Sequence, residues 1–397
     1  MRNHIKTALF MAAASLLLAG ADVSVQADSQ VAINDNNFAW AIKEYAVEAD
    51  DNGDGMLSAK EAAEVTRIHL DSSQNIDSFR GIEYFTNLKD FFYRANTAST
   101  ETDDYRIYAA STASELNLSG MKKLNRVRII CSNSYLKTVD LGDCTKLKEV
   151  SIRGRESVDN LNLRGCTNLR TVDCSDITVE KLNLSKLNKL ETVTVNGDRM
   201  QNLNLNKCYN LESVNAGGDS LIKLKLKGDK KLESLNVGAP SMMILDLSTN
   251  TGLKDLYLSD VKIPSPDLSD NRNLTQLNCY QTGILSLDLR ENKKLTEVDC
   301  HNNKNMAELK VKGCTKLKIL RCYNTALTKL NVTKNPNLKN LHCKQTAISK
   351  LNLKNNKKLR KLICSETNIR ELDLSNTNIH DASGLECDDT VAVTYAD

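Results

Sequence analysis

The sequence lacks the motifs that mark most enzymes and membrane proteins. After a first apolar run at residues 8–18 no second long apolar stretch occurs, and a run of that length is too short to span a bilayer. No nucleophile elbow, phosphate-binding loop or pair of cysteines and histidines at zinc-ligand spacing is present. We therefore expect neither a transmembrane protein nor an enzyme, and predict no catalytic residue.

The first residues have the pattern of a secretory signal peptide. Arg2 and Lys6 precede the apolar run, and small-residue cleavage patterns follow it. We expect a signal peptide over residues 1–21, with cleavage after residue 21 or residue 27. No cysteine lies near either position, which argues against a lipoprotein anchor. The expected location is extracytoplasmic: the periplasm, the cell surface or the medium.

A leucine recurs eleven times with steps of 21 or 22 residues. A fixed period of this size, built on L-x-x-L-x-L, predicts a solenoid in which each unit is too small to bury its own apolar face and stacking supplies the core. We expect about 12–13 coils of parallel strands over residues 67–385, an irregular insertion at 94–114 and a C-terminal cap at 386–397. The recurring leucines are Leu147, Leu169, Leu190, Leu211, Leu232, Leu253, Leu274, Leu295, Leu317, Leu338 and Leu359.

One well-preserved repeat, residues 274–294, defines the positions. Leu274, Leu277 and Cys279 at positions 1, 4 and 6 alternate along a short strand and are expected to point inward. Positions 14 and 16, Leu287 and Leu289, form a second apolar pair on the opposite side of the coil. Side chains at positions 3, 5 and 7 should face solvent.

This pattern resembles the leucine-rich repeat family, and in particular its secreted bacterial, internalin-like members. The resemblance covers roughly residues 65–385 and implies fold far more than function. The family consensus has asparagine at position 9, which only Asn303 retains among the regular repeats. Other repeats have threonine there, whose hydroxyl we expect to serve the backbone of the neighbouring coil with fewer hydrogen bonds. These threonines are Thr282, Thr325, Thr346 and Thr367.

Ten of the twelve cysteines occupy two repeat positions. Six lie at position 6 and four at position 19, where other repeats carry asparagine. A disulfide ladder is the alternative, but equivalent side chains on stacked strands leave in parallel about 4.8 Å apart, whereas a disulfide needs converging Cβ atoms about 3.8 Å apart. We expect free, buried thiols that act as small apolar residues at position 6 and as weak donors at position 19.

A calcium loop is predicted at residues 50–61, within a helix–loop–helix cap at residues 28–66. The segment D-D-N-G-D-G-M-L-S-A-K-E matches the EF-hand pattern at every specified position, and it resembles EF-hand and dockerin-type loops. Hard calcium requires several oxygen ligands. The alternative is an acidic turn in which Ser58 and Glu61 form a helix capping box. The expected ligands of one Ca²⁺ are Asp50, Asn52, Asp54, Met56 through its carbonyl, Ser58 and Glu61.

Exposed aromatic and polar side chains gather at positions 5 and 7 of the C-terminal repeats. Aromatics beside arginine and asparagine are typical of interface anchors, although scattered surface tyrosines would give a similar pattern by chance. The predicted partner surface consists of Tyr257, Asn278, Tyr280, His301, Arg321, Tyr323 and His342.

Charge is distributed unevenly along the chain. Residues 22–66 contain ten acidic and two basic residues, whereas residues 290–370 contain twenty basic and five acidic residues. The basic segment could attract an anionic partner, but a solvated convex face is the simpler interpretation. Nucleic acid is the least expected partner, because no nucleic-acid-binding module is recognisable.

Taken with the repeat, these features favour a secreted, non-enzymatic protein that binds a protein or a glycan through its repeat surface. The alternative is a structural envelope or matrix component whose solenoid acts as a spacer.

Overall fold

The computed structural model describes residues 30–33, 35–70, 75–95, 111–131 and 134–395. The expected signal peptide and most of the expected insertion at 94–114 lie outside these residues. Contacts divide the chain into two compact units, described separately below. Unit 1 runs to Leu190 and includes Thr194–Arg199, and unit 2 contains Glu191–Val193 and Met200–Asp397.

Unit 1 begins with three short helices. They are α2 (Asn36–Ala41), α3 (Lys43–Ala49) and α4 (Ala59–Glu64). Phe38 and Ile42 are fully buried, as expected for one face of an amphipathic segment, although the helix is interrupted at Ile42. The buried Asp35 carboxylate caps α2 by accepting the main-chain N–H groups of Asn37 and Phe38.

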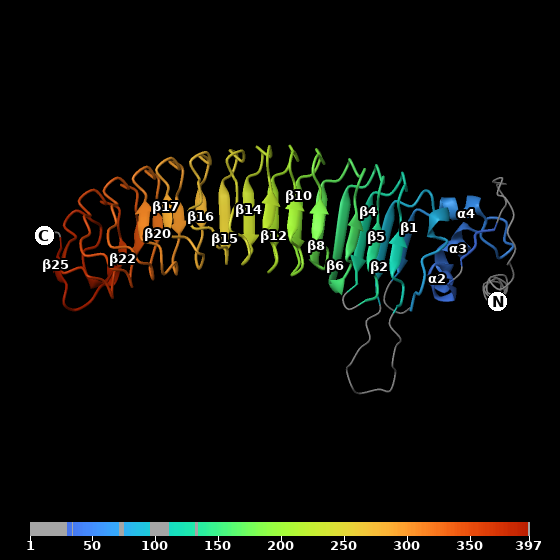
Figure 1. The fold of residues 1–397 in the computed structure, drawn as a ribbon, viewed down its shortest axis with the longest axis horizontal. Helices are drawn as coiled ribbons and strands as arrows, with labels where there is room; N and C mark the ends of the chain where they lie inside the picture. Colours follow the sequence, from blue (N-terminus) through green and yellow to red (C-terminus); the bar gives the residue numbers. More distant parts are fainter. Residues whose placement is uncertain (1–29, 34, 71–74, 96–110, 132–133, 396–397) are drawn as a thin grey trace, which may run out of the picture. The chain divides into compact units, whose positions relative to one another are not determined.

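The rest of unit 1 is a coil of short parallel strands on two sides (Figure 1). The front strands are β1 (Arg67–Leu70), β2 (Asp90–Arg94), β4 (Arg126–Ile130), β6 (Glu149–Ser157) and β8 (Thr171–Ile177). The back of the coil carries the 3-10 helix η1 (Ile82–Tyr84) and the strands β3 (Glu115–Asn117), β5 (Thr138–Asp140), β7 (Asn160–Asn162) and β9 (Lys181–Asn183). Strand β10 (Thr192–Asn196) lies where the two units divide.

Unit 2 repeats the same arrangement with greater regularity. Its front strands are β12 (Ser213–Gly217), β14 (Ser234–Gly238), β15 (Asp255–Ser259), β16 (Gln276–Asn278), β18 (Glu297–Asp299), β20 (Ile319–Arg321), β21 (Asn340–His342), β22 (Lys361–Ile363) and β24 (Leu385–Glu386). Its other elements are β11 (Asn202–Asn204), β13 (Lys223–Lys225), β17 (Ser286–Asp288), β19 (Glu308–Lys310), β23 (Glu371–Asp373), η2 (Ala382–Gly384) and β25 (Ala392–Thr394). The final strand, β25, pairs in parallel with β23.

The core follows the predicted positions. In the repeat at 274–294, Leu274, Leu277, Cys279, Leu287 and Leu289 are at most 1% exposed. Neighbouring front strands pair in register one coil apart, so equivalent apolar residues stack along the solenoid. Fifteen front strands occur among the described residues of the two units. Because each coil contributes one front strand, the number of coils is higher than the expected 12–13. Strands outside the regular leucine period, such as β1, β2 and β24, account for the additional coils.

Position 19 carries a hydrogen-bonded ladder inside the coil. Each buried asparagine donates its side-chain amide to two main-chain carbonyls of preceding coils; Asn271, for example, donates to Leu247 and Asn250 at 3.1 and 3.0 Å. Cysteine at this position replaces these two bonds with a weaker one, as when the Cys144 thiol donates to the Leu118 carbonyl at 3.1 Å. The sequence-based expectation of a weak thiol donor is confirmed.

The cysteines at position 6 lie fully buried, and all twelve cysteines of the chain are free thiols. Burial raises the pKa of the Cys322 and Cys364 thiols to about 12, so they remain protonated at neutral pH. The expectation of buried, apolar-acting free thiols is confirmed.

The prediction for the threonines at position 9 was wrong in one respect. The hydroxyls of Thr325, Thr346 and Thr367 donate to the carbonyl three residues earlier in their own coil, at 2.8 Å, rather than to a neighbouring coil. Asn303 does bridge coils, because its amide donates to Cys279 at 2.8 Å and to Cys300 at 2.9 Å. At position 9 the hydroxyl is turned toward its own coil, whereas Thr275 and Thr296 at position 2 do donate to carbonyls of the preceding coil, at 3.2 and 3.1 Å.

Candidate partner surface and calcium loop

Four rings of the predicted partner surface form a continuous stack in unit 2. The ring centroids of Tyr280 and His301 lie 5.0 Å apart, those of His301 and Tyr323 4.3 Å, and those of Tyr323 and His342 4.1 Å. The interplanar angles are 6°, 14° and 21°, so each ring lies face to face with the next. We call Tyr280, His301, Tyr323 and His342 the ring stack.

The repeat backbone positions these rings. Tyr280, His301 and Tyr323 occupy position 7 of successive coils, two residues after the ends of the front strands β16, β18 and β20. The next residue in each coil has left-handed backbone, with φ of 55° at Gln281, 58° at Asn302 and 55° at Asn324. Because the chain turns sharply at the same point in each coil, the three rings leave the sheet edge in parallel, one strand spacing apart.

The fourth ring comes from a different position. His342 is at position 5 on β21, where it is the register partner of Arg321. Its Nε2 atom is buried and has no hydrogen-bond partner among the described residues. Burial lowers the pKa of His342 to about 4, with the nearby positive charge of Lys344 acting in the same direction. His342 is therefore neutral at physiological pH.

A charged network lies beside the stack. His301 Nδ1 is 2.5 Å from the Asp299 carboxylate, and the Arg321 guanidinium lies 2.5 Å from Glu297 and 3.5 Å from Asp299. The Asp299 side chain is only 13% exposed. These contacts orient the His301 ring and hold Arg321 against the sheet, which reduces the entropy that either would lose on binding a partner.

The structure brings together some of the predicted surface residues and separates others. Asn278 accepts the main-chain N–H of Tyr280 through its side-chain oxygen at 3.4 Å and thus supports the turn. Tyr257 is outside the stack, where its hydroxyl donates to Gln276 at 2.8 Å. Glu297, the partner of Arg321, was missed by the sequence analysis, although its position 3 on β18 is among those expected to face solvent.

The stack determines which chemistry this surface can offer. Ring faces inside the stack are covered by neighbouring rings, so the exposed parts are ring edges and the outer face of Tyr280, which is 37% exposed. Carbohydrate recognition by aromatic residues uses open ring faces, whereas protein partners can pack against edges and tyrosine hydroxyls. This surface therefore offers ring edges, tyrosine hydroxyls and one outer ring face to a partner.

The loop at residues 50–61 has a tightly wound backbone. Gly53 and Gly55 adopt left-handed backbone with φ of 72° and 79°, which only glycine adopts without strain. The carboxylate of Asp50 accepts the N–H groups of both glycines, at 2.7 and 3.2 Å. Asn52 and Asp54 each accept the N–H group two residues later, at 2.9 and 2.8 Å.

The last part of this loop also forms the alternative arrangement considered from the sequence. Ser58 caps α4 by accepting the Glu61 N–H at 3.2 Å, and the Glu61 carboxylate accepts the Ser58 N–H at 2.8 Å. Glu61 also accepts the N–H of Asp51 at 3.2 Å. Burial acts to raise the pKa of Glu61, but these hydrogen bonds outweigh it and leave the pKa below its usual value.

The described residues contain no preformed cluster of metal-binding side chains. No group of three His, Cys, Asp or Glu side chains in the described ranges stands close enough to hold a metal ion. The loop nevertheless offers an all-oxygen donor set of the kind calcium prefers, with side chains now directed to main-chain N–H groups. The chemistry of the donors fits calcium, and a bound ion would have to replace some of these hydrogen bonds.

Within the part of the chain that the structure describes, no helix has the length and apolar character needed to cross a membrane.

Comparison with known proteins returned structural similarities only. No protein-family model matches the chain, and no curated protein matches it. Among solved structures, the functional domain of InlJ from Listeria monocytogenes, described as including a cysteine ladder, is 21% identical, with a TM-score of 0.49, over 91% of this chain and 74% of that one. An internalin, inlF, from Listeria monocytogenes is 16% identical, with a TM-score of 0.49, over 91% of this chain and 95% of that one. A leucine-rich repeat protein from Leptospira interrogans is 17% identical, with a TM-score of 0.40, over 85% and 97%.

Proposed function

We propose that this chain is an exported, non-enzymatic repeat protein that binds a protein partner through the ring stack. The observation that carries the proposal is the face-to-face stacking of Tyr280, His301, Tyr323 and His342 on the front of unit 2. The stack presents tyrosine edges and hydroxyls on a rigid sheet, with their side-chain rotamers already restricted. Pre-organised aromatic anchors of this kind dominate the binding energy of many protein interfaces.

Arg321 adds a polar contact beside the aromatic anchors. Its side chain is 37% exposed although it is paired with Glu297 and Asp299. An arginine held by two carboxylates keeps several N–H donors in a fixed plane, which suits recognition of a main-chain carbonyl or a carboxylate on a partner. Arginine and tyrosine together form the typical centre of a protein interface.

The proposal is tested by arrays of proteins and glycans probed with the mature chain and with the variant Tyr280→Ala/Tyr323→Ala. A protein ligand should lose about thirtyfold or more in affinity, as expected when anchor residues worth about 2 kcal/mol are removed. Tyr209→Ala is the matched control, because Tyr209 is 52% exposed in the same unit but outside the stack.

Three results would count against the proposal. A glycan ligand would show that open faces, such as that of Tyr280, matter more than the covered ones. A protein ligand that is equally weakened by Tyr209→Ala would place the interface elsewhere. The absence of any ligand, together with self-association of the chain, would favour the structural spacer.

We also propose that residues 50–61 bind one calcium ion that stabilises the helical cap of unit 1. The expected ligands are Asp50, Asn52, Asp54, the Met56 carbonyl, Ser58 and Glu61. Support comes from the two left-handed glycines and from the oxygen side chains that the loop already winds around. The ion would supply positive charge to three carboxylates and so hold α3 and α4 at the ends of the loop.

A further inference from the structure

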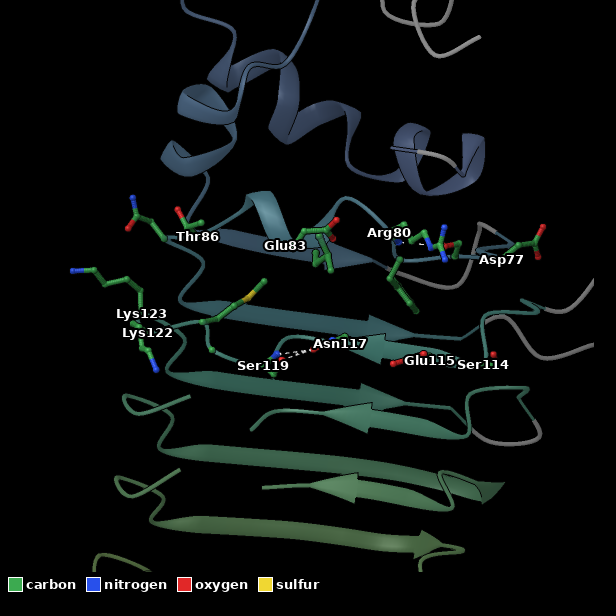
Figure 2. Close-up of a pocket in the computed structure, with 16 residues that line it drawn as sticks. Asp77, Arg80, Glu83, Thr86, Ser114, Glu115, Asn117, Ser119, Lys122 and Lys123 are labelled. Carbon is green, nitrogen blue, oxygen red and sulfur yellow. Dashed lines mark hydrogen bonds between the residues drawn. The ribbon is translucent and has the colours of Figure 1, made fainter. Parts of the chain in front are cut away.

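A groove lies on the back of unit 1, between the segment at residues 77–87 and the segment at residues 114–123 (Figure 2). Its volume is about 930 Å³. The buried side chains of Phe79, Ile82 and Met121 line it as an apolar floor, and its rim is polar and charged. This groove is separate from the ring stack, which belongs to unit 2.

One wall of the groove is the open edge of a β-strand. Strand β3 pairs with β5 on one side only and is the end strand of its sheet. Ser114 accepts the N–H groups of Lys137 and Thr138, and Leu118 donates to Asp140 at 2.8 Å, so the even-numbered residues direct their main-chain groups to β5. Main-chain groups alternate between the two edges of a strand. Those of Glu115 and Asn117 therefore face the groove.

Within the part of the chain that the structure describes, no strand completes this edge. Among the described residues, the main-chain N–H and C=O groups of Glu115 and Asn117 have no hydrogen-bond partner toward η1. The preceding coil places the 3-10 helix η1 at this level, after Gly81, whose left-handed φ of 101° turns the chain. A strand edge with unpaired groups is a template for pairing with another chain.

The opposite wall is held in place by buried contacts. The Asp35 carboxylate accepts the main-chain N–H of Asp77 at 2.5 Å and that of Ser78 at 2.7 Å. A Cβ atom at Gly81 would come within 2.8 Å of Ile33, so the turn fits closely against the N-terminal segment. The groove is therefore bordered by anchored backbone and does not need to be organised by its ligand.

Charge is arranged along the groove. Figure 2 shows Asp77 and Glu115 near one end, where β3 begins, and Lys122 and Lys123 at the other end, beyond Ser119. Arg80 and Glu83 lie between the ends on the opposite wall. Lys122 donates to the Asp143 carbonyl at 3.1 Å, which fixes its position. A strand parallel to β3 would place its amino end near the two carboxylates and its carboxyl end near the two lysines.

We propose that this groove binds an extended peptide segment of a partner protein as an additional strand parallel to β3. The peptide has a basic residue or free amine at its amino end and an acidic residue or free carboxylate at its carboxyl end. Main-chain hydrogen bonds to Glu115 and Asn117 supply affinity, and the charges at the two ends set the direction. This site is independent of the partner proposed for the ring stack.

The test uses a fluorescent peptide of sequence KTVTVTE and its reverse, ETVTVTK with an amidated carboxyl end. Binding to the mature chain is followed by fluorescence anisotropy. KTVTVTE should bind at least about tenfold more tightly than the reverse peptide, a difference of about 1.4 kcal/mol. Lys122→Glu with Lys123→Glu should remove this preference, because both ends of the groove are then acidic. Equal binding of both peptides, or no saturable binding of KTVTVTE, would overturn the proposal.

A matched pair of substitutions tests the strand edge itself. Asn117→Pro removes the main-chain N–H that faces the groove and leaves the bonds of Leu118 and Ser114 to β5 in place; proline is tolerated on edge strands. Asn117→Ala keeps that N–H, and both variants lose the side-chain contact from Asn117 to Ser119. Asn117→Pro should bind KTVTVTE with an affinity about tenfold or more lower than that of Asn117→Ala.

Equal affinity of the two variants would show that no strand forms on β3. Hydrogen exchange of residues 134–162 in both variants checks that the sheet remains folded, and the Tyr280→Ala/Tyr323→Ala variant should bind the peptide like the wild type. A loss of peptide binding in that variant would assign the peptide to the ring stack instead.

Discussion

Asp229 occupies position 19, where the neighbouring coils of unit 2 carry asparagine or cysteine, and it is completely buried. One of its carboxylate oxygens accepts the Cys208 N–H at 2.8 Å, while the other has no partner among the described residues. Burial raises its pKa to about 7, against which the N–H groups of Cys208 and Lys207 act only in part. We predict that Asp229→Asn stabilises the protein at neutral and alkaline pH.

The sign and size follow from proton linkage. The folded state holds the Asp229 proton up to about pH 7, whereas the unfolded chain releases it near pH 4. The contribution of Asp229 to stability is therefore fully present below pH 4 and is lost as the pH rises to about 7. A shift of about three pKa units corresponds to roughly 4 kcal/mol.

Asparagine avoids this loss and adds hydrogen bonds. By the register of Asn250, whose amide donates to carbonyls 24 and 21 residues earlier, an amide at position 229 would donate to Leu205 and Cys208. We expect Asp229→Asn to be more stable than the wild type by several kcal/mol at pH 8, on the order of the 4 kcal/mol above. At pH 4 the difference should fall to about 1 kcal/mol, the worth of ordinary hydrogen bonds.

Hydrogen exchange of residues 203–235 between pH 5 and pH 8 is the appropriate assay, because long repeat arrays need not unfold in one cooperative step. Asn250→Asp is the mirror control: it introduces the same buried carboxylate in another coil and should create a pH-dependent loss. A difference between Asp229→Asn and wild type that is constant over this pH range would refute the reasoning.

Three further outcomes are expected. Millimolar calcium should raise the melting temperature of the wild type by mass action. It should not raise that of Glu61→Gln, which keeps the helix cap but loses the bidentate carboxylate. An unchanged melting temperature of the wild type in calcium would show that the loop is only an acidic turn. Alkylation in denaturant without reductant should modify all twelve cysteines, whereas a mass deficit would reveal disulfides. Gly313→Ala should lower the free energy of unfolding by about 1–3 kcal/mol, because its Cβ would approach the Arg290 carbonyl oxygen within 1.7 Å. Thermal melting measures this loss, with Gly238→Ala as the control, where the closest atom to the added Cβ is the Ser259 hydroxyl at 3.1 Å.

The leucine period correctly predicted the repeat core because burial in a solenoid depends on position within the coil. Leu274 and its equivalents are buried by the coils on either side, whatever the more distant sequence contains. The same reasoning located the thiols at position 6 and the weak donors at position 19. It failed for the threonines at position 9, because the folded turn, and not the period, sets the direction in which each hydroxyl points.

The candidate sites were only partly predictable. Tyr280, His301 and Tyr323 share position 7, so their proximity follows from the repeat, but nothing in the pattern shows that rings stack face to face. The residue that extends the stack is His342 at position 5, while Lys344 occupies the equivalent position 7 of that coil. Which side chain packs against Tyr323 depends on how the turn directs each ring, and this is a property of the folded backbone.

The sequence by itself therefore determined the coil, its core and the residue types displayed on each face, because these depend on a local period and on burial. Only the tertiary structure decided how residues about 21 positions apart meet. It aligned four rings into one stack, buried Asp229 without a full set of partners, and left the edge of β3 open beside η1. Each of these depends on distances between coils, which stacking sets and which no single repeat encodes.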